Sequence, residues 1–133
     1  MMLENSNVFT SYSINDRDTA LNFYHNTLGL EVKQNSMGLL EIHFSNGATV
    51  FLYPKNDHVA ATYTVLNFPV DDLEATVDRL AAKGVRFEKY GGDIKTDEKG
   101  ISRGNGPMIA WFKDPSGNIL SVLQNFPEEE NQP

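Results

Sequence analysis

Cysteine is absent from this chain of 133 residues. Its absence excludes disulfide bonds, thiolate metal ligands and cysteine nucleophiles. No apolar run reaches the length of a membrane span, and residues 1–7 lack the basic flank and apolar core of a secretory leader. Since a cysteine-free chain fits a reducing compartment, we expect a cytoplasmic protein with no membrane partner.

Basic residues are also scarce. The chain has 11 Lys and Arg against 18 Asp and Glu, which gives a formal net charge of −7. Nucleic-acid binding needs a basic surface, so no nucleic-acid partner is expected. Part of the acidic excess lies near the C-terminus, where residues 126–133 are predicted to form a flexible acidic tail.

The hydrophobic pattern runs through the same order twice. In the first half, an extended run at 8–14 precedes a helical pattern at about 17–27, with Asp16 as its N-cap and Gly29 as its stop. The corresponding segments of the second half are an extended run at 62–70 and a helix that starts at Asp71-Asp72 and stops at Gly84. Strand-like runs follow each helix, at 30–34, 39–44 and 48–53 in the first half and at 85–88, 108–112 and 118–123 in the second.

This repeat predicts an α+β fold made of two tandem βαβββ modules, at about 7–54 and 61–125. One such unit cannot bury both faces of its sheet, so the two sheets are expected to pair into a cupped mixed sheet within one domain over 7–125. The alternative is two unrelated α+β halves that look alike by chance.

Several short motifs occur in a familiar order. The segment DRDTALNFY at 16–24 is followed by LGL at 28–30, and the second half has VDDLE at 70–74, GV at 84–85 and DPSGN at 114–118. Together, over about residues 7–125, they resemble the vicinal-oxygen-chelate superfamily of glyoxalase I, bleomycin-resistance proteins and extradiol dioxygenases. The resemblance implies a ligand cleft lined by the concave faces of both sheets. In the family's enzymes, up to four His, Glu or Gln side chains there hold a divalent metal.

The residues at those four positions are unsuited to a metal. The resemblance places the ligands at Phe9, Phe51, Val65 and Ser121. Three of these side chains have no ligand atom, and a serine hydroxyl is a poor ligand for transition metals. A shift of one residue does not restore the site. We therefore predict no metal and no other cofactor, which favours the metal-less, bleomycin-resistance-like branch.

Among the three histidines, His43 is the one predicted to face the cleft. Alternation along 39–44 places Glu41 and His43 on the face opposite the more apolar residues. They are weak candidates for catalysis, and the alternative is a polar pair on an exposed sheet face. His25 is expected at a helix surface and His58 in solvent.

The same alternation predicts a largely apolar and aromatic lining. Its proposed ligand-binding members are Phe9, Ser11, Glu41, His43, Phe51, Tyr53, Val65, Asn67, Trp111 and Ser121. Such a lining suits a flat or amphipathic small molecule. The alternative is that these side chains fill the cup and leave no cavity.

An insertion at 91–106 is rich in glycine and charge. It lies where the family has a loop over the cleft mouth, so it is predicted to be a lid, with a disordered excursion as the alternative. Arg103 within it is predicted to pair with an anionic ligand.

Three functions remain open. The first is a metal-free protein that binds a small aromatic or amphipathic molecule and acts as a homodimer, as the resemblance implies. The second is a superfamily lyase, isomerase or dioxygenase with an unorthodox metal or acid–base site around Glu41 and His43. The third is a regulatory module whose cup is incidental. The sequence favours binding over catalysis.

Overall fold

The computed structural model describes residues 2–104 and 106–125. The chain divides into two compact units, one ending at Ala60 and the other beginning at Ala61, which we call module one and module two. Each module is described by itself, and the single domain over 7–125 stays a prediction. The predicted acidic tail, 126–133, lies outside the described residues.

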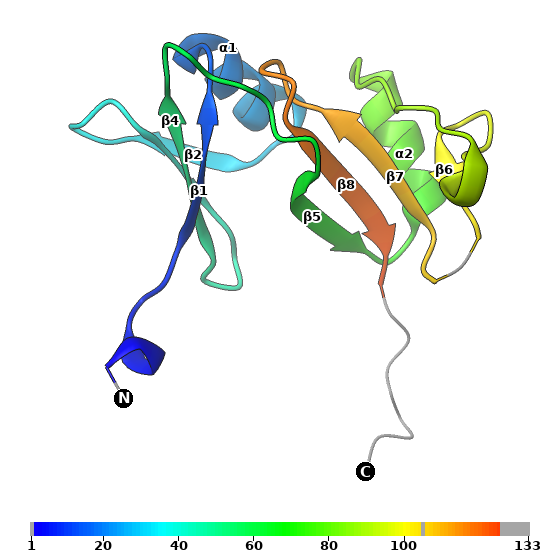
Figure 1. Cartoon of the computed structure of the whole chain (residues 1–133), viewed down its shortest axis with the longest axis horizontal. Coiled ribbons are helices and arrows are strands. Elements are labelled where there is room, and N and C mark those ends of the chain that lie inside the picture. The colour runs from blue at the N-terminus through cyan, green and yellow to red at the C-terminus, as the bar shows by residue number, and fades with distance from the viewer. Residues whose placement is uncertain (1, 105, 126–133) are drawn as a thin grey trace. The chain divides into compact units, whose positions relative to one another are not determined.

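Module one is a four-stranded mixed sheet with a helical segment on one face (Figure 1). Its strands are β1 (Thr10–Ile14), β2 (Glu31–Gln34), β3 (Leu40–His43) and β4 (Thr49–Pro54). The strand order is β1-β4-β3-β2, with β1 parallel to β4 and the other pairs antiparallel. A short 3₁₀ turn, η1 (Leu3–Asn5), precedes the sheet.

The helical segment of module one is α1 (Arg17–Leu21), continued by a π-helical turn, η2 (Asn22–Thr27). The predicted cap is confirmed, because the Asp16 carboxylate accepts a hydrogen bond from the Thr19 N–H at 2.8 Å. Gly29 has φ = +75°, a left-handed conformation that glycine adopts without strain and that ends the helix.

Alternating side chains fix the position of the core of module one. Its buried hydrophobic residues lie on the helical segment and on the sheet face beneath it: Tyr12, Ile14, Ala20, Tyr24, Leu40, Ile42, Val50 and Leu52. Full burial of a large aliphatic side chain contributes about 1.5–3 kcal/mol. The hydroxyl groups of Tyr12 and Tyr24 lie 2.7 Å apart inside this core, so the two rings are joined by a hydrogen bond as well as by packing.

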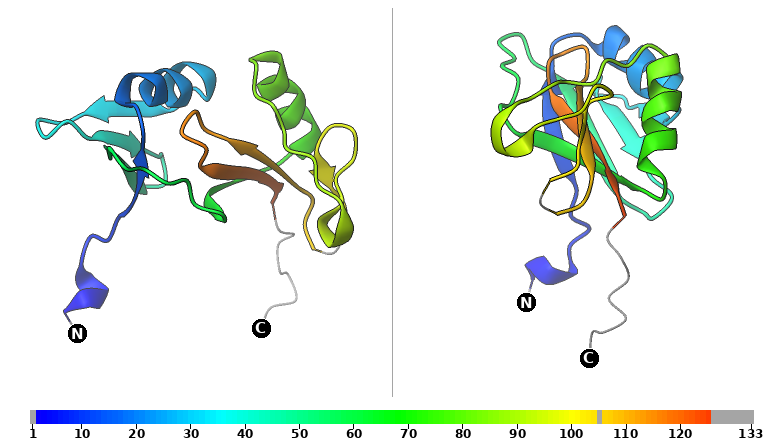
Figure 2. Two further views of the ribbon diagram at one scale, coloured as in Figure 1. Left: turned by 45° about the horizontal axis from the view of Figure 1, so that its top comes forward. Right: turned by 90° about the vertical axis from the view of Figure 1, so that its right-hand side faces the viewer.

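Module two repeats the topology. Its elements are β5 (Thr64–Val70), α2 (Leu73–Ala82), η3 (Gly92–Ile94), β6 (Ile101–Ser102), β7 (Ile109–Lys113) and β8 (Ile119–Gln124). The strand order β5-β8-β7-β6 is the counterpart of the order in module one, and α2 lies along one face of the sheet (Figure 2). The two βαβββ modules are therefore confirmed, because both halves have the same strand order.

One predicted strand of module two is wrong. Residues 85–88 form no strand and keep a single bridge, Phe87 to Phe112. The outer strand is β6, inside the predicted insertion, and Ile101 is 1% exposed opposite Ala110 of β7. After α2 the chain pairs with β7 at one residue, Phe87, and then leaves it for a charged, glycine-rich excursion. The short buried pair at 101–102 pairs with β7 on its return and completes the sheet.

No helix among residues 2–104 and 106–125 has the length and apolar character needed to cross a bilayer. The longest α-helix in this part of the chain, α2, has 10 residues and includes charged side chains.

Candidate functional site

The face of the module-one sheet opposite α1 is aromatic and partly exposed; we call it face one. Phe9 stacks on Phe51 with ring centroids 4.5 Å apart and planes inclined by 29°. Phe9 is 57% exposed and Tyr53 is 36% exposed, although both are large hydrophobic side chains. Exposed aromatic rings with a fixed mutual geometry are suited to stacking against a planar molecule.

Face one also holds the predicted polar pair. Nε2 of His43 lies 3.0 Å from Oε1 of Glu41, and the Asn35 side-chain amide donates to Oε2 of Glu41 at 3.1 Å. The hydrogen bond from Asn35, followed by that from His43, holds the pKa of Glu41 below its ordinary value of 4.5. Glu41 also opposes Phe51 directly across β3 and β4. An ionised carboxylate therefore lies beside the stacked rings.

A second histidine reaches face one, which the sequence did not indicate. Nδ1 of His58 lies 2.6 Å from the Ser13 hydroxyl, so the prediction that His58 is solvated is wrong. His58 belongs to the turn after β4, and Ser13 pairs with Tyr53 across β1 and β4. Ser11, the other predicted hydroxyl of this strand, is exposed and opposes Phe51. His25, by contrast, is exposed on the helical segment, as expected.

The face of the module-two sheet opposite α2, face two, carries the remaining candidates. The Ser121 hydroxyl donates to the Asn67 side-chain carbonyl at 2.6 Å, and Ser121 is 0% exposed. Trp111 opposes Ser121 across β7 and β8 and meets the Tyr90 ring edge-on at 5.5 Å. Burial raises the pKa of Tyr90 above its ordinary value of 10.0. Ser121 is thus enclosed in the sheet, whereas Asn67 on the same face is exposed.

Val65 stands apart from its predicted neighbours. The register of β5 against β8 shifts between Thr64 and Leu66, so that Thr64 opposes Ile119 and Leu66 opposes Leu120. Val65 is the extra residue of this β-bulge and has no direct cross-strand partner in the register. Because of this bulge, the alternation of side chains along a strand does not decide which face of the sheet the Val65 side chain occupies.

Ion pairs connect the segment around β6 to α2. Lys99 lies 3.1 Å from Asp78 and 3.6 Å from Glu74, both on α2. Arg103 pairs with Asp97 at 2.9 Å and with Glu74 at 3.3 Å. An anionic ligand at Arg103, as predicted from the sequence, would therefore compete with the carboxylates of Asp97 and Glu74. A disordered excursion is wrong for 101–102, which form β6, and the lid role stays a prediction.

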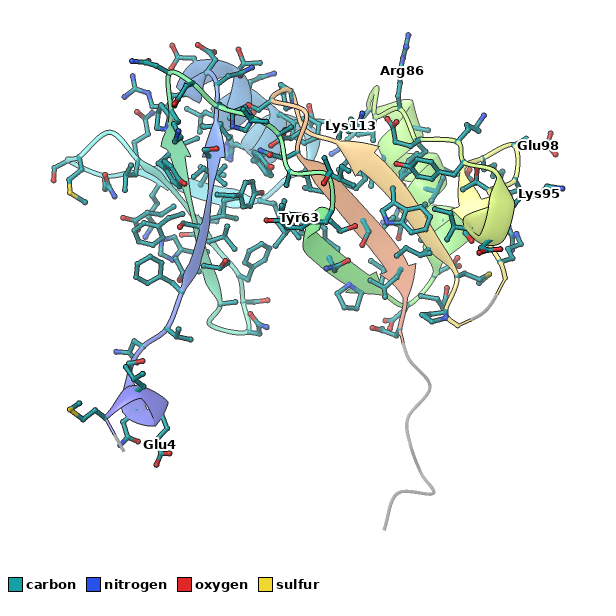
Figure 3. The ribbon with its side chains drawn as sticks, in the orientation of Figure 1. Glu4, Tyr63, Arg86, Lys95, Glu98 and Lys113 are labelled. Atoms are coloured by element: carbon teal, nitrogen blue, oxygen red, sulfur yellow. The ribbon has the colours of Figure 1, made fainter. Side chains whose placement is uncertain are left out.

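An open cavity of about 470 Å³ lies on the helix side of module two, where no site residue was predicted. Its walls come from α2, from residues 85–89 and from the segment before β6. The apolar part includes Val77 and Phe87, and the charged rim includes Arg86 and Glu98. Figure 3 shows the Arg86 and Glu98 side chains pointing away from the fold.

The family's metal does not fit this chain. Phe9 and Phe51 fill two of the four implied ligand positions with stacked rings, and Ser121 uses its hydroxyl to bind Asn67. In the part of the chain that the structure describes, no three His, Asp or Glu side chains gather in a geometry that could hold a metal ion. Neutral aromatic rings offer no lone pair to a divalent ion.

Comparison with known proteins agrees with this architecture. The family model described as Glyoxalase/Bleomycin resistance protein/Dioxygenase superfamily matches residues 8–122. A curated protein of Vibrio cholerae serotype O1, named "Probable lactoylglutathione lyase", is 27% identical over 133 aligned residues, covering 87% of this chain and 88% of that protein.

Solved structures share the fold. "Oxidase ChaP-H2" has a TM-score of 0.66 at 20% identity, covering 96% of this chain and 99% of that one. TnmS3, described as an antibiotic binding protein from Streptomyces sp. CB03234, has a TM-score of 0.62 at 20% identity, covering 92% and 98%. At these identities the likeness concerns the fold.

Proposed function

Because the chain belongs to the Glyoxalase/Bleomycin resistance protein/Dioxygenase superfamily, we propose that it binds a small flat or amphipathic molecule on the helix-free faces of its sheets, without a metal. The observation that supports this most directly is the stacked, partly exposed pair of Phe9 and Phe51. It stands where the family's enzymes have metal ligands. A stacking surface suits retention of a ring system, whereas chelation of its oxygens needs ligands that are missing here.

Glu41 is better suited to ligand binding than to general-base catalysis. Its lowered pKa keeps the carboxylate ionised at neutral pH, where it can accept a hydrogen bond from a ligand or attract a positive group. A general base works best when its pKa lies near the working pH. The hydrogen bonds from Asn35 and His43 shift Glu41 away from that range.

The test is a binding titration with the single tryptophan, Trp111, as reporter for face two and calorimetry as the reporter for the whole chain. A panel of aromatic and glycopeptide compounds should include at least one that binds. Phe51→Ala should weaken that binding about tenfold or more, since aromatic contacts are worth ~0.5–1.5 kcal/mol beyond the lost buried area. Met37→Ala, at an exposed turn position, is the matched control. A folded protein that binds no member of the panel would contradict the proposal.

Metal independence has a separate test. Elemental analysis of the dialysed protein should find no stoichiometric zinc, nickel, manganese or iron. Stoichiometric metal that survives dialysis and is lost in His43→Ala would overturn the metal-free proposal.

We also infer that the working form is a homodimer, as in the bleomycin-resistance proteins that the chain resembles. Sedimentation velocity should then give the mass of two chains.

The second candidate is an enzyme of the same superfamily that uses Glu41 and His43. It is favoured by their contact of 3.0 Å and by the name of the curated relatives, "Probable lactoylglutathione lyase". In that case the purified protein should form or break down lactoylglutathione, and both Glu41→Gln and His43→Gln should reduce the rate about 100-fold or more, the usual range for loss of an acid or base. Unchanged rates in both variants would exclude this pair.

A further inference from the structure

Ser13 and His58 form a close pair that the proposed binding function does not use. The Ser13 Oγ and His58 Nδ1 atoms lie 2.6 Å apart, although the residues are separated by 45 positions in the sequence. The contact is partly buried, at the end of face one beside Tyr53. A hydroxyl and an imidazole nitrogen at this distance have the geometry of a nucleophile and its base.

Backbone bonds hold the imidazole in place. The Lys55 N–H donates to the Ile14 carbonyl at 3.0 Å, which fixes the chain leaving β4 to the end of β1. The His58 N–H then donates to the Lys55 carbonyl at 3.0 Å and closes a turn. The base is therefore carried by a short turn anchored to the strand that carries the hydroxyl. Such anchoring reduces the conformational freedom that would otherwise be lost when the pair reacts.

We propose that Ser13 is a nucleophile, with His58 as its base, that accepts the acyl group of an activated aryl ester. Oγ attacks the ester carbonyl carbon while Nδ1 takes the hydroxyl proton. The bond from that carbon to the aryl oxygen breaks, and the aryl oxide leaves with the bonding electron pair. The proton on Nδ1 passes to the solvent. Water then attacks the acyl carbon while Nδ1 takes one of its protons, and Nδ1 returns that proton to Oγ as the carboxylic acid leaves.

The neighbouring side chains suit an aryl group. Tyr53 opposes Ser13 across β1 and β4, and Phe51 opposes Ser11 one step along the same strands. The hydroxyl thus lies at the edge of the stacked rings of face one, where an aromatic leaving group can pack while the carbonyl meets Oγ. Alkyl esters of the same acyl group have no ring to pack there and a poorer leaving group.

A second serine of β1 offers a comparison for the site of acylation. Ser11 lies on the same strand and the same face, two positions before Ser13, but no imidazole bond is found at its hydroxyl in the described chain. If proximity to aromatic rings were sufficient, both serines would react. If the imidazole activates the hydroxyl, only Ser13 does.

The experiment uses the full chain and p-nitrophenyl acetate. Release of p-nitrophenolate should show a burst of about one equivalent, followed by slow turnover. Ser13→Ala should abolish the burst, and His58→Asn should slow it by about 100-fold, the order contributed by a positioned base. Ser45→Ala, at an exposed turn position outside the candidate site, should keep the burst. Tryptic peptide mass spectrometry should find the acetyl group on Ser13, and not on the peptide 56–79 that carries His58.

Thermal unfolding of each variant separates loss of reactivity from loss of fold. His58→Asn alters a turn outside the sheet, so it carries the test if Ser13→Ala unfolds. Absence of a burst in the folded wild type overturns the proposal, as does a burst that persists in Ser13→Ala with the label on another residue. The burst reports acylation of Ser13, whereas the compound panel reports equilibrium binding, so either inference can fail while the other stands.

Discussion

At the scale of single residues, hydrogen bonds from neighbouring side chains lower the pKa of the carboxyl group on face one. The Asn35 amide has the largest effect on the Glu41 carboxyl, and His43 comes second. Both donors come from the same module as Glu41, from β3 and the turn before it. The carboxylate is thus prepared locally for an incoming hydrogen-bond donor.

Asn35→Ala should therefore raise the pKa of Glu41 toward its ordinary value of 4.5. A carboxyl whose pKa is lowered by folding stabilises the folded state above the unfolded pKa, and this contribution is lost as the pH falls through the lowered value. The variant should lose less stability between about pH 5 and pH 3 than the wild type does. Carboxyl NMR titration measures the pKa directly, and an unchanged value in Asn35→Ala would contradict the assigned cause.

At the scale of elements, hydrogen bonds to capping side chains stabilise the starts of the α-helices. In the described part of the chain, both α-helices begin at an aspartate whose side chain accepts from the backbone N–H three residues on: Asp16 from Thr19 and Asp72 from Ala75. The Thr19 hydroxyl, followed by the Thr19 N–H, lowers the pKa of Asp16. A cap satisfies a backbone donor that the helix itself cannot satisfy.

Asp16→Ala should cost about 1 kcal/mol of unfolding free energy, the usual value for an N-cap. Asp18→Ala removes the same charge from the same turn but no cap bond, so it should cost only about 0.3 kcal/mol. Urea denaturation of the two variants measures the difference. Equal losses would indicate that charge at the helix start, and not the cap bond, is responsible.

Three glycines of the segment before β6 allow two reasons for glycine to be measured separately. One is a positive φ angle, and the other is a lack of space for a Cβ atom. Gly91 has φ = −109° and open space around it, and Gly92 has φ = +71° and open space. Gly100 has φ = +89°, and the Cβ of an alanine there would lie only 2.7 Å from the Phe87 Cβ. Alanine should be nearly neutral at Gly91, cost about 1 kcal/mol at Gly92, and cost more at Gly100 because the strain and a clash add. Denaturant midpoints give the order, and a neutral Gly100→Ala would contradict the close packing under Phe87.

At the scale of the whole molecule, the two modules meet in sequence at an irregular stretch. Residues 55–63 contain no helix or strand, and Tyr63 near the end of this stretch is 69% exposed. Protease cleavage favours exposed segments without regular structure. Limited chymotrypsin digestion should therefore cut first after Tyr63 and leave the buried Tyr24 and Phe112 intact. Tyr63→Ala should slow that first cut, and early cleavage inside either module would contradict this division.

The sequence predicted the modules well because their pattern is carried by many residues at once. It missed β6 because a strand of two residues, Ile101 and Ser102, is too short to show a period. It assigned Val65 to a face by alternation, which a bulge interrupts. The contact between Ser13 and His58 depends on a turn that follows β4, and no local signal links positions 45 apart.

The π-helical turn of module one records a difference in length between the two modules. Gly29 follows Ile14 by 15 positions, whereas Gly84 follows Val70 by 14. A π-helical turn holds one residue more than an α-helical turn between the same two ends. The turn at Asn22–Thr27 thus absorbs the additional residue while Tyr24 stays buried against the sheet. The additional residue of module one is therefore accommodated inside the helical segment, and neither the strand before it nor the glycine after it has to shift.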